Sequence, residues 1–401
     1  MRKALPLAVA ASCLAASISF ANPQYGPGVT DTEIKLGQTV PYSGNGSPIG
    51  IPTAGATQAL LRRLNEAGGI NGRKINLLSL DDALSPPKTV EQTRRLVESD
   101  EVLAIVGSLG SAPNAAIQKY LNGKKVPQLF IMSGSSRFLD PKEFPWTMPW
   151  PVSSERIGEA YGRYVRQAKP DAKVSIIYQN DEYGREGEKG IRKGLGADAD
   201  KLIIAERTYN ITDPTLDSQI VSLRSSGADI LFHVSIPKFA AQGLRKVSEL
   251  EWQPIQFVDV PSASIAATFK PVGLDKAIGV ISATYFKDPR DPRWKDDPAV
   301  AEYIATMKAF APDIDPYDSN ALFGYSVGES LVAVLRQCGD DLSRENLMRQ
   351  AADLKQVPLS LLLPGITLNT AKDDYAPIKQ LRLMRFNGTS WDPFGEIMTI
   401  P

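Results

Sequence analysis

Two short polar loops, residues 107–111 and 133–137, contain the residue types best suited to binding an anion. Each loop follows an apolar run and combines serines with glycine. Serine hydroxyls donate hydrogen bonds, and the free backbone N–H groups at a helix start favour negative charge. Serine and glycine are also common helix caps, which is the purely structural interpretation of one such loop. Because two successive loops share the pattern, we interpret them as the ligand site.

Two charged side chains near the expected cleft keep two interpretations open. Arg137 follows the second polar loop, where its guanidinium would pair with a ligand carboxylate or lie in solvent. Lys238 has the same ambiguity. The aromatic residues Phe144, Trp146 and Trp150 are expected to pack between lobes rather than to line the cleft.

A serine hydrolase is the main alternative from another class of function. Residues 324–328 fit the Gly-x-Ser-x-Gly pattern, with Ser326 as the nucleophile. That nucleophile requires a strand before it and a helix after it, whereas residues 320–335 have a helical pattern on both sides. A catalytic triad also needs a histidine, and the only one, His233, ends an apolar strand. We therefore expect a binding protein and no enzymatic activity.

The first 21 residues have the features of an export signal, which predicts a periplasmic protein. A short basic start precedes an apolar run at 5–20, and a small-x-small cleavage site ends at Ala21. The apolar run is too short to span a membrane. Cys13 lies in this run but lacks the large aliphatic residue that a lipoprotein signal places three positions earlier, so its lipidation is left open.

The mature chain has the composition of a nearly neutral globular protein, which gives no indication of nucleic-acid or membrane binding. Cys338 is its single cysteine, so no intramolecular disulfide is expected. One histidine, one cysteine and short acidic pairs provide no metal site. Gly44, Gly46 and Gly50 miss the dinucleotide-binding spacing by one residue. We therefore expect neither a metal nor another cofactor.

Strands and helices alternate along most of the chain, and this alternation positions the polar loops. It predicts mostly parallel sheets covered by helices on both faces. A segment rich in proline and aromatic residues, 141–151, interrupts the pattern and separates two such units. The strands are predicted at 33–40, 75–80, 103–106, 174–178, 202–206, 230–234, 255–260 and 280–286.

The last third of the chain returns to both units. Residues 299–354 have a helical pattern without strands, so we assign them to the first unit, and strands predicted at 366–368 and 380–386 return to the second. The result is an α/β protein with two doubly wound parallel-sheet lobes joined by three hinge crossovers. The lobes are predicted at 22–149 with 287–364 (N-terminal) and at 150–286 with 365–401 (C-terminal).

Several short motifs, in their order along the chain, resemble the branched-chain amino-acid binding proteins. These are exported solute receptors of ABC importers with the type I periplasmic binding fold. The resemblance covers essentially the whole mature chain and implies a small-molecule ligand, an ABC permease in the inner membrane as partner, and a monomer. The motifs lie at 35–37, 43–50, 65–72, 81–82, 107–108 and 178–184.

The resemblance also implies which residues bind the ligand. Ser111, Gly134 and Ser136 match the groups that hold the ligand carboxylate in the family, and Tyr183 matches a tyrosine that contacts the ligand from the second lobe. The chain has Ile49 where amino-acid-binding members have a pocket tyrosine. The complete expected set is Ser111, Gly134, Ser135, Ser136, Tyr183, Ile49, Ser235 and Pro261.

One departure from the family decides the expected ligand. Where amino-acid-binding members have an acidic residue for the ligand ammonium, this chain reads Val260-Pro261-Ser262, with no carboxylate unless Asp259 turns into the cleft. An unpaired buried ammonium costs several kcal/mol. Segments 144–148 and 294–298 also resemble the branch of the family that is found with aromatic-compound uptake.

We therefore expect a carboxylate with an apolar body as the ligand. An aromatic acid such as a benzoate or phenylpropanoid comes first, and short aliphatic or keto acids come second. A receptor for branched-chain or other amino acids remains the alternative, and a chemotaxis or signalling receptor would share the fold and the site.

Overall fold

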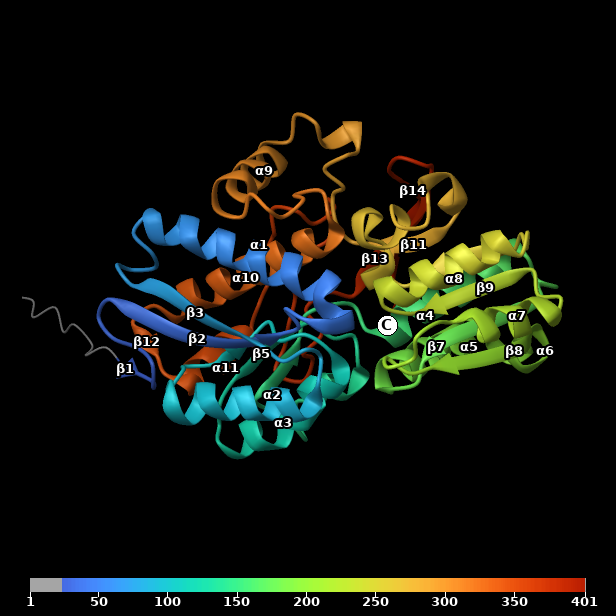
Figure 1. Ribbon diagram of the computed structural model, residues 1–401. Helices are drawn as coiled ribbons and strands as arrows, with labels where there is room; N and C mark the ends of the chain where they lie inside the picture. Colours follow the sequence, from blue (N-terminus) through green and yellow to red (C-terminus); the bar gives the residue numbers. More distant parts are fainter. Residues whose placement is uncertain (1–23, 401) are drawn as a thin grey trace, which may run out of the picture.

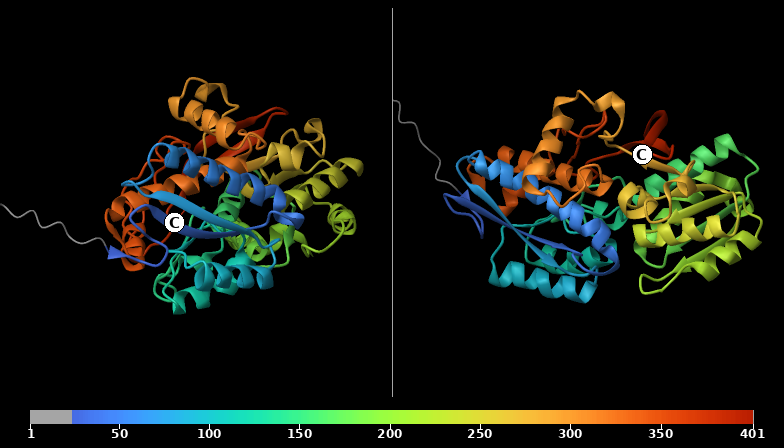
Figure 2. Two further views of the ribbon diagram at one scale, coloured as in Figure 1. Left: turned by 60° about the vertical axis from the view of Figure 1, so that its left-hand side comes forward. Right: turned by 45° about the horizontal axis from the view of Figure 1, so that its top comes forward.

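The structure is a computed structural model that describes residues 24–400, and its chain forms two lobes side by side (Figures 1 and 2). Each lobe is built on one large β-sheet flanked by helices. The first lobe contains the blue and teal segments in Figure 1, and the second contains the green and yellow ones. The predicted two-lobe α/β fold is confirmed.

The first sheet brings the two polar loops together. Its strands are parallel and lie in the order β3-β2-β4-β5-β6. Because β4 pairs with β5, the loops that follow them meet at one sheet edge, where Gly110 N donates to Met132 O at 3.2 Å. The strands are β2 (Glu33–Val40), β3 (Lys74–Asp81), β4 (Ile105–Val106), β5 (Gln128–Ile131) and β6 (Thr147–Pro149).

Helices from distant parts of the sequence cover the first sheet. On one face α1 packs against α9 and α10, and on the other α2 packs against α3 (Figure 1). Helices α9 and α10 follow the second lobe in the sequence, so the chain has returned to cover the first sheet. The helices are α1 (Ser47–Glu66), α2 (Pro86–Arg94), α3 (Ser111–Gly123), α9 (Pro298–Phe310), α10 (Ser319–Cys338) and α11 (Arg344–Ala351).

The second sheet has the order β14-β13-β11-β10-β9-β7-β8. Its strands are parallel except for β13 and β14, which form an antiparallel hairpin beside β11. The strands are β7 (Val174–Gln179), β8 (Ile203–Tyr209), β9 (Ile230–Val234), β10 (Ile255–Val258), β11 (Ile281–Thr284), β13 (Gln380–Phe386) and β14 (Trp391–Thr399). The helices are α4 (Ser154–Ala168), α5 (Glu182–Leu195), α6 (Ala199–Leu202), α7 (Asp217–Ser225) and α8 (Pro237–Glu249).

Helices α4 and α5 are in backbone contact because glycines line their interface. A Cβ atom at Gly158 would lie 2.4 Å from the carbonyl oxygen of Gly187, and one at Gly190 would lie 2.0 Å from that of Glu155. Only glycine permits this separation. Helix α5, which carries the predicted ligand-binding Tyr183, is therefore held closely against α4.

Two predictions about the last third of the chain are wrong in detail. Residues 366–368 do not form a strand, because Leu368 makes only an isolated bridge with Val357. The strand that follows β13 is instead β14, whose interrupted apolar pattern gives little alternation. The predicted helical segment 299–354 also contains a two-residue strand, β12 (Asp341–Leu342), which pairs with β1 (Gln24–Tyr25).

The three crossovers between the lobes meet near one buried tryptophan. Trp150, after β6, stacks on Phe286 with ring centroids 6.1 Å apart, and its indole N–H donates to Ser330 Oγ of α10 at 2.7 Å. The second and third crossovers are joined where Leu363 N donates to Tyr285 O at 2.9 Å. Trp150 therefore packs in the hinge region, as predicted.

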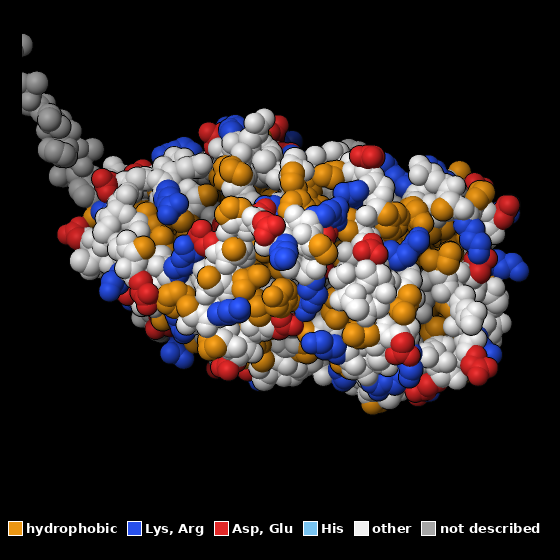
Figure 3. Space-filling view, turned by 90° about the horizontal axis from the view of Figure 1, so that it is seen from above, with side chains coloured by type: hydrophobic (Ala, Val, Ile, Leu, Met, Phe, Trp, Pro, Cys, Tyr) orange, Lys and Arg blue, Asp and Glu red, His pale blue; other side chains and the backbone are white. Residues whose placement is uncertain are grey.

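The charges on the surface are mixed. On the face seen in Figure 3, basic and acidic side chains alternate among apolar ones, without an extended patch of one sign. None of the helices formed by residues 24–400 is both long and apolar enough to cross a membrane. The export signal, its cleavage site at Ala21 and Cys13 lie outside the described residues.

Candidate functional site

A cavity of about 280 Å³ lies between the two lobes. The first lobe contributes the N-terminal ends of α1 and α3 and the loop after β5. The second lobe contributes the N-terminal end of α5 and the loop after β10. The N-terminal end of α10, the crossover after β11 and the start of α4 also line the cavity. Both lobes therefore contact anything that fills the cavity.

The first-lobe end of the cavity is suited to an anion. Helix α3 begins at Ser111, and its N-cap Gly110 provides no side chain to bond the N–H groups of the first turn. Gly110 has φ +98° and its Cβ position is crowded by Leu84, so another residue would be strained there. Ser111 Oγ lies 2.7 Å from Ser133 Oγ in the neighbouring loop. Two hydroxyls and an uncapped helix start thus converge on one place.

The second-lobe side of the cavity contains two carboxylates. Asp259 follows β10, accepts a hydrogen bond from Val260 N at 2.9 Å, and is bonded to the Tyr183 hydroxyl. Burial raises the pKa of Asp259 above its usual range, although the hydrogen bond from Tyr183 opposes this. Asp181 caps α5, with one oxygen 3.1 Å from Gly184 N and the other 2.6 Å from Gln179 Nε2. Each carboxylate already has protein donors but retains lone pairs for a ligand.

Most of the remaining wall is apolar. Burial also raises the pKa of Tyr183 well above its usual value, so this phenol stays neutral and serves as a hydrogen-bonding group. Aromatic rings gather where the crossover meets α10. The larger apolar side chains of the wall are Ile49, Leu84, Leu109, Met132, Val152, Ile157, Ile211, Ile236, Val260, Tyr285, Phe286, Phe323 and Met384. The cavity therefore accommodates an apolar body between its polar ends.

The expected ligand-binding residues fall into two groups. Ser111, Gly134, Tyr183, Ile49 and Pro261 line the cavity. Ser235 is fully buried behind the wall, where its carbonyl oxygen accepts a hydrogen bond from Ser262 and lies 3.4 Å from the Tyr183 hydroxyl, whose single proton it shares with Asp259.

Ser135 and Ser136 hold the lobes together instead of lining the cavity. Ser135 Oγ donates to Glu182 Oε1 at 2.8 Å, and Ser136 Oγ donates to Glu186 Oε1 at 2.5 Å. Arg137 Nη1 lies 3.3 Å from Glu182 Oε2. All three contacts join the loop after β5 to α5 of the other lobe.

A second contact joins the lobes near the start of α1. Asn45 Nδ2 donates to Ile211 O at 2.7 Å, and Asn45 Oδ1 accepts from Lys238 Nζ at 3.1 Å. The lobes are thus bonded both here and at α5, so the structure represents a closed form. Arg137 and Lys238, whose roles the sequence left open, both take part in this closure.

A family model described as "Periplasmic binding protein" matches residues 33–390. This chain belongs to the periplasmic binding protein family. Family members are binding proteins, and curated relatives match over nearly the full length. The "Amino acid binding protein" of Pseudomonas aeruginosa is 24% identical over 92% of this chain and 93% of its own. The "Leu/Ile/Val-binding protein homolog 1" of Brucella abortus is 24% identical over 89% and 91%.

Solved structures support the type I periplasmic binding fold. A branched-chain amino acid ABC transporter protein from Thermus thermophilus with bound valine has a TM-score of 0.82 at 16% identity, covering 92% of this chain and 97% of its own. A fatty acid ABC transporter substrate-binding protein from Thermomonospora curvata has a TM-score of 0.78 at 21% identity, covering 94% and 95%. At these identities the likeness establishes the fold alone.

The surroundings of Ser326 in this periplasmic binding protein differ from those of a hydrolase nucleophile. Ser326 is fully buried in the interior of α10 and does not line the cavity. His233 is buried at the end of β9, where its Nε2 lies 3.1 Å from Gln256 Oε1. Burial lowers the pKa of His233 to about 4. Ser326 thus occupies a helix rather than the strand-to-helix turn of a nucleophile.

Sequence reasoning missed several residues of the wall. Asp181 was missed, although it comes two residues after β7, and Asp259, which the sequence raised only as a condition, directly follows β10. The position of both at the carboxyl edge of the sheet was a usable signal. Ser133 stood in the recognised polar loop without being chosen. Ser319, Asn320 and Phe323 begin α10, which reaches the cavity only through tertiary packing that no local pattern reveals.

Proposed function

We propose that this periplasmic binding protein is the solute receptor of an ABC importer and captures a small carboxylic acid between its lobes. The observation that carries the proposal is the uncapped start of α3 beside Ser111 and Ser133, at one end of a mainly apolar cavity. A carboxylate there would accept charge-assisted hydrogen bonds from the hydroxyls and from the backbone N–H groups of Ser111 and Ala112, since Pro113 has no N–H.

An acid of phenylpropanoid or benzoate type is the first candidate ligand. Tyr285, Phe286 and Phe323 give the wall aromatic faces for a ring. Ile49 makes the wall apolar at the position where the resemblance places a tyrosine in amino-acid-binding members. One structural neighbour is described as a fatty acid ABC transporter substrate-binding protein, which supports an apolar acid without specifying its shape.

An amino acid is the second candidate, and one observation favours it. The sequence left an acidic partner for a ligand ammonium only if Asp259 faced the cleft. Asp259 lines the cavity, as does Asp181. An ammonium group placed near these carboxylates would be paired instead of isolated. The names of curated relatives also refer to amino acids.

Binding drives closure in this proposal. A ligand that contacts Ser111 of one lobe and Tyr183 of the other binds the closed form better than the open form. The equilibrium shifts by that difference in affinity, and an inner-membrane permease would recognise the closed surface. We further propose export to the periplasm with cleavage after Ala21, action as a monomer, and lobes divided at the predicted boundaries.

Isothermal titration with matched ligands tests the proposal. The pairs are 3-phenylpropanoate with L-phenylalanine and 4-methylpentanoate with L-leucine, whose members differ only by the α-ammonium. We expect each acid to bind at least tenfold more tightly than its amino acid, with a loss of binding in Ser111→Ala. Tighter binding of the amino acids, lost in Asp259→Asn, would establish the second candidate instead. Failure of every ligand to bind would refute a carboxylate receptor.

A further inference from the structure

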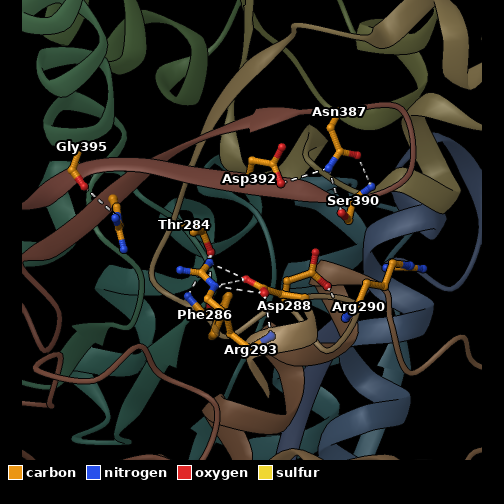
Figure 4. Close-up of polar contacts among 11 residues, drawn as sticks. Thr284, Phe286, Asp288, Arg290, Arg293, Asn387, Ser390, Asp392 and Gly395 are labelled. Atoms are coloured by element: carbon orange, nitrogen blue, oxygen red, sulfur yellow. Dashed lines mark hydrogen bonds and ion pairs between the residues drawn. The ribbon is translucent and has the colours of Figure 1, made fainter. Parts of the chain in front are cut away.

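A second, smaller chamber of about 40 Å³ adjoins the ligand cavity. It lies beneath the crossover after β11, between that crossover and the β13–β14 hairpin. Figure 4 shows these two segments next to each other, with Thr284, Phe286 and Asp288 on one and Asn387 and Asp392 on the other. The cavity and the chamber share the wall residues Ala263, Thr284, Phe286, Ser319 and Met384.

The chamber lies away from the end of the cavity that is suited to an anion. None of its wall residues belongs to α3 or to the loop after β5, which contain Ser111 and Ser133. A ligand that reached both places would have its carboxylate at α3 and its opposite end at the shared wall. Such a ligand must be elongated.

Two polar atoms of the chamber residues are buried without a hydrogen-bond partner. They are Ser319 Oγ, on the wall shared with the cavity, and Asp288 Oδ2. The other carboxylate oxygen of Asp288 accepts from Arg290 N at 2.9 Å, and the backbone N–H of Trp391 also interacts with this carboxylate and opposes the rise in its pKa that burial causes. Buried polar groups in native proteins nearly always have partners, so two unpartnered groups at one chamber need an explanation.

Two other polar side chains of the chamber are already engaged. Arg290 donates to Tyr317 O and to Asp315 Oδ2, the latter at 3.2 Å. The Trp391 indole N–H donates to Ala263 O at 3.0 Å. Tyr317 and Trp294 also line the chamber, but Ser319 Oγ and Asp288 Oδ2 are the polar atoms of its described wall that are both buried and without a hydrogen-bond partner.

The volume of the chamber limits the size of that guest. A cavity needs a volume of about 10–15 Å³ to hold one water molecule. The chamber at about 40 Å³ therefore holds two or three water-sized groups, such as a hydroxyl and the carbon that bears it, but no ring. The body of the ligand belongs in the larger cavity.

We propose that the chamber is a distal subsite for the terminal hydroxyl group of an elongated carboxylic acid, and this inference rests on the proposed function. The hydroxyl donates to Asp288 Oδ2 and accepts from Ser319 Oγ–H, which supplies the partners that both atoms lack. The substrate class is thereby narrowed to acids with a small hydrogen-bonding group at the end opposite the carboxylate.

Titration of two probes against three proteins tests the subsite. The probes are 3-phenylpropanoate and 3-(4-hydroxyphenyl)propanoate, and the proteins are the wild type, Ser319→Ala and Ser326→Ala. Ser326 is the matched control, because its hydroxyl is also buried and unpartnered in α10 but does not line either space. We expect the hydroxylated acid to bind about tenfold more tightly to the wild type and to Ser326→Ala, and Ser319→Ala to lose most of that advantage.

The remaining outcomes separate this inference from the proposed function. Equal binding of the two acids, or an advantage that survives in Ser319→Ala, would overturn the subsite while leaving a carboxylate receptor intact. Binding of neither acid would overturn both. As a second variant, Leu322→Phe narrows the chamber from a wall that the main cavity does not share. It should weaken the hydroxylated acid more than the parent acid.

Discussion

Replacing Ser136 with alanine should lower the affinity for every ligand by the same factor. The Ser136 hydroxyl donates to Glu186 across the lobes, and neither residue lines the cavity. The substitution therefore removes a contact that stabilises closure and leaves the ligand's own contacts in place. Ser111→Ala, by contrast, should act only on ligands with a carboxylate.

The size of the effect follows from the environment of the contact. A hydrogen bond to a charged group contributes about 1.5–3 kcal/mol when both partners are buried. Glu186 is only partly buried and regains water when the lobes open, which reduces the loss to about 1 kcal/mol. Because 1.4 kcal/mol corresponds to a tenfold change, we expect the dissociation constant to rise roughly fivefold.

Isothermal titration with 3-phenylpropanoate and benzoate measures this effect, and a double-mutant cycle assigns it. In a Glu186→Gln background, Ser136→Ala should cost less than it costs in the wild type, because the two residues share one bond. A loss that differs severalfold between the two acids would show that Ser136 touches the ligand. Fully additive substitutions would show that its bond to Glu186 does not support closure.

Three further predictions concern stability and the hydrolase alternative. Burial raises the pKa of Glu329 to about 7, so the folded state retains a proton that the unfolded chain releases near pH 4.5, and stability falls as the pH rises between these values. Between pH 5 and pH 8 the free energy of unfolding, measured with urea, should fall by about 2–3 kcal/mol more in the wild type than in Glu329→Gln. An equal fall in the two proteins would show that Glu329 does not cause the pH dependence. Gly190→Ala should destabilise the fold by about 3 kcal/mol or more by pressing on Glu155, while Gly123→Ala, with open space around it, should not; equal melting temperatures would refute the close contact. Ser326→Ala should leave ligand affinity within twofold, and the loss of an ester-hydrolysing activity in this variant would revive the hydrolase.

The inner strands of the two sheets were predictable because they are buried on both faces. Residues 230–234, for example, are uniformly apolar apart from His233, and they form β9 with the predicted bounds. Strand β14 was not predictable in this way, since it lies at the sheet edge and its residues Pro393 and Gly395 interrupt the alternation. Its pairing with β13 depends on the hairpin.

Site residues that lie at the ends of strands could be predicted from the sequence. Contacts that form only when the two lobes close could not. Ser111 and Gly134 lie at the carboxyl ends of neighbouring parallel strands, which is a general location for ligands. Ser135 and Ser136 stand one or two positions further on, and the side-chain direction that turns them toward α5 is set by the second lobe. No local pattern specifies that contact.

Thermal unfolding with an acid and its amide tests most directly whether this protein captures a carboxylate between its lobes. The pair is 3-phenylpropanoate and 3-phenylpropanamide, with leucine as the reference for an amino-acid receptor. A ligand at about 100 times its dissociation constant stabilises the folded state by roughly 2.7 kcal/mol. We expect the acid to raise the melting temperature and the amide to leave it unchanged. Equal stabilisation by the amide, or no response to any acid including leucine, would contradict the capture of a carboxylate.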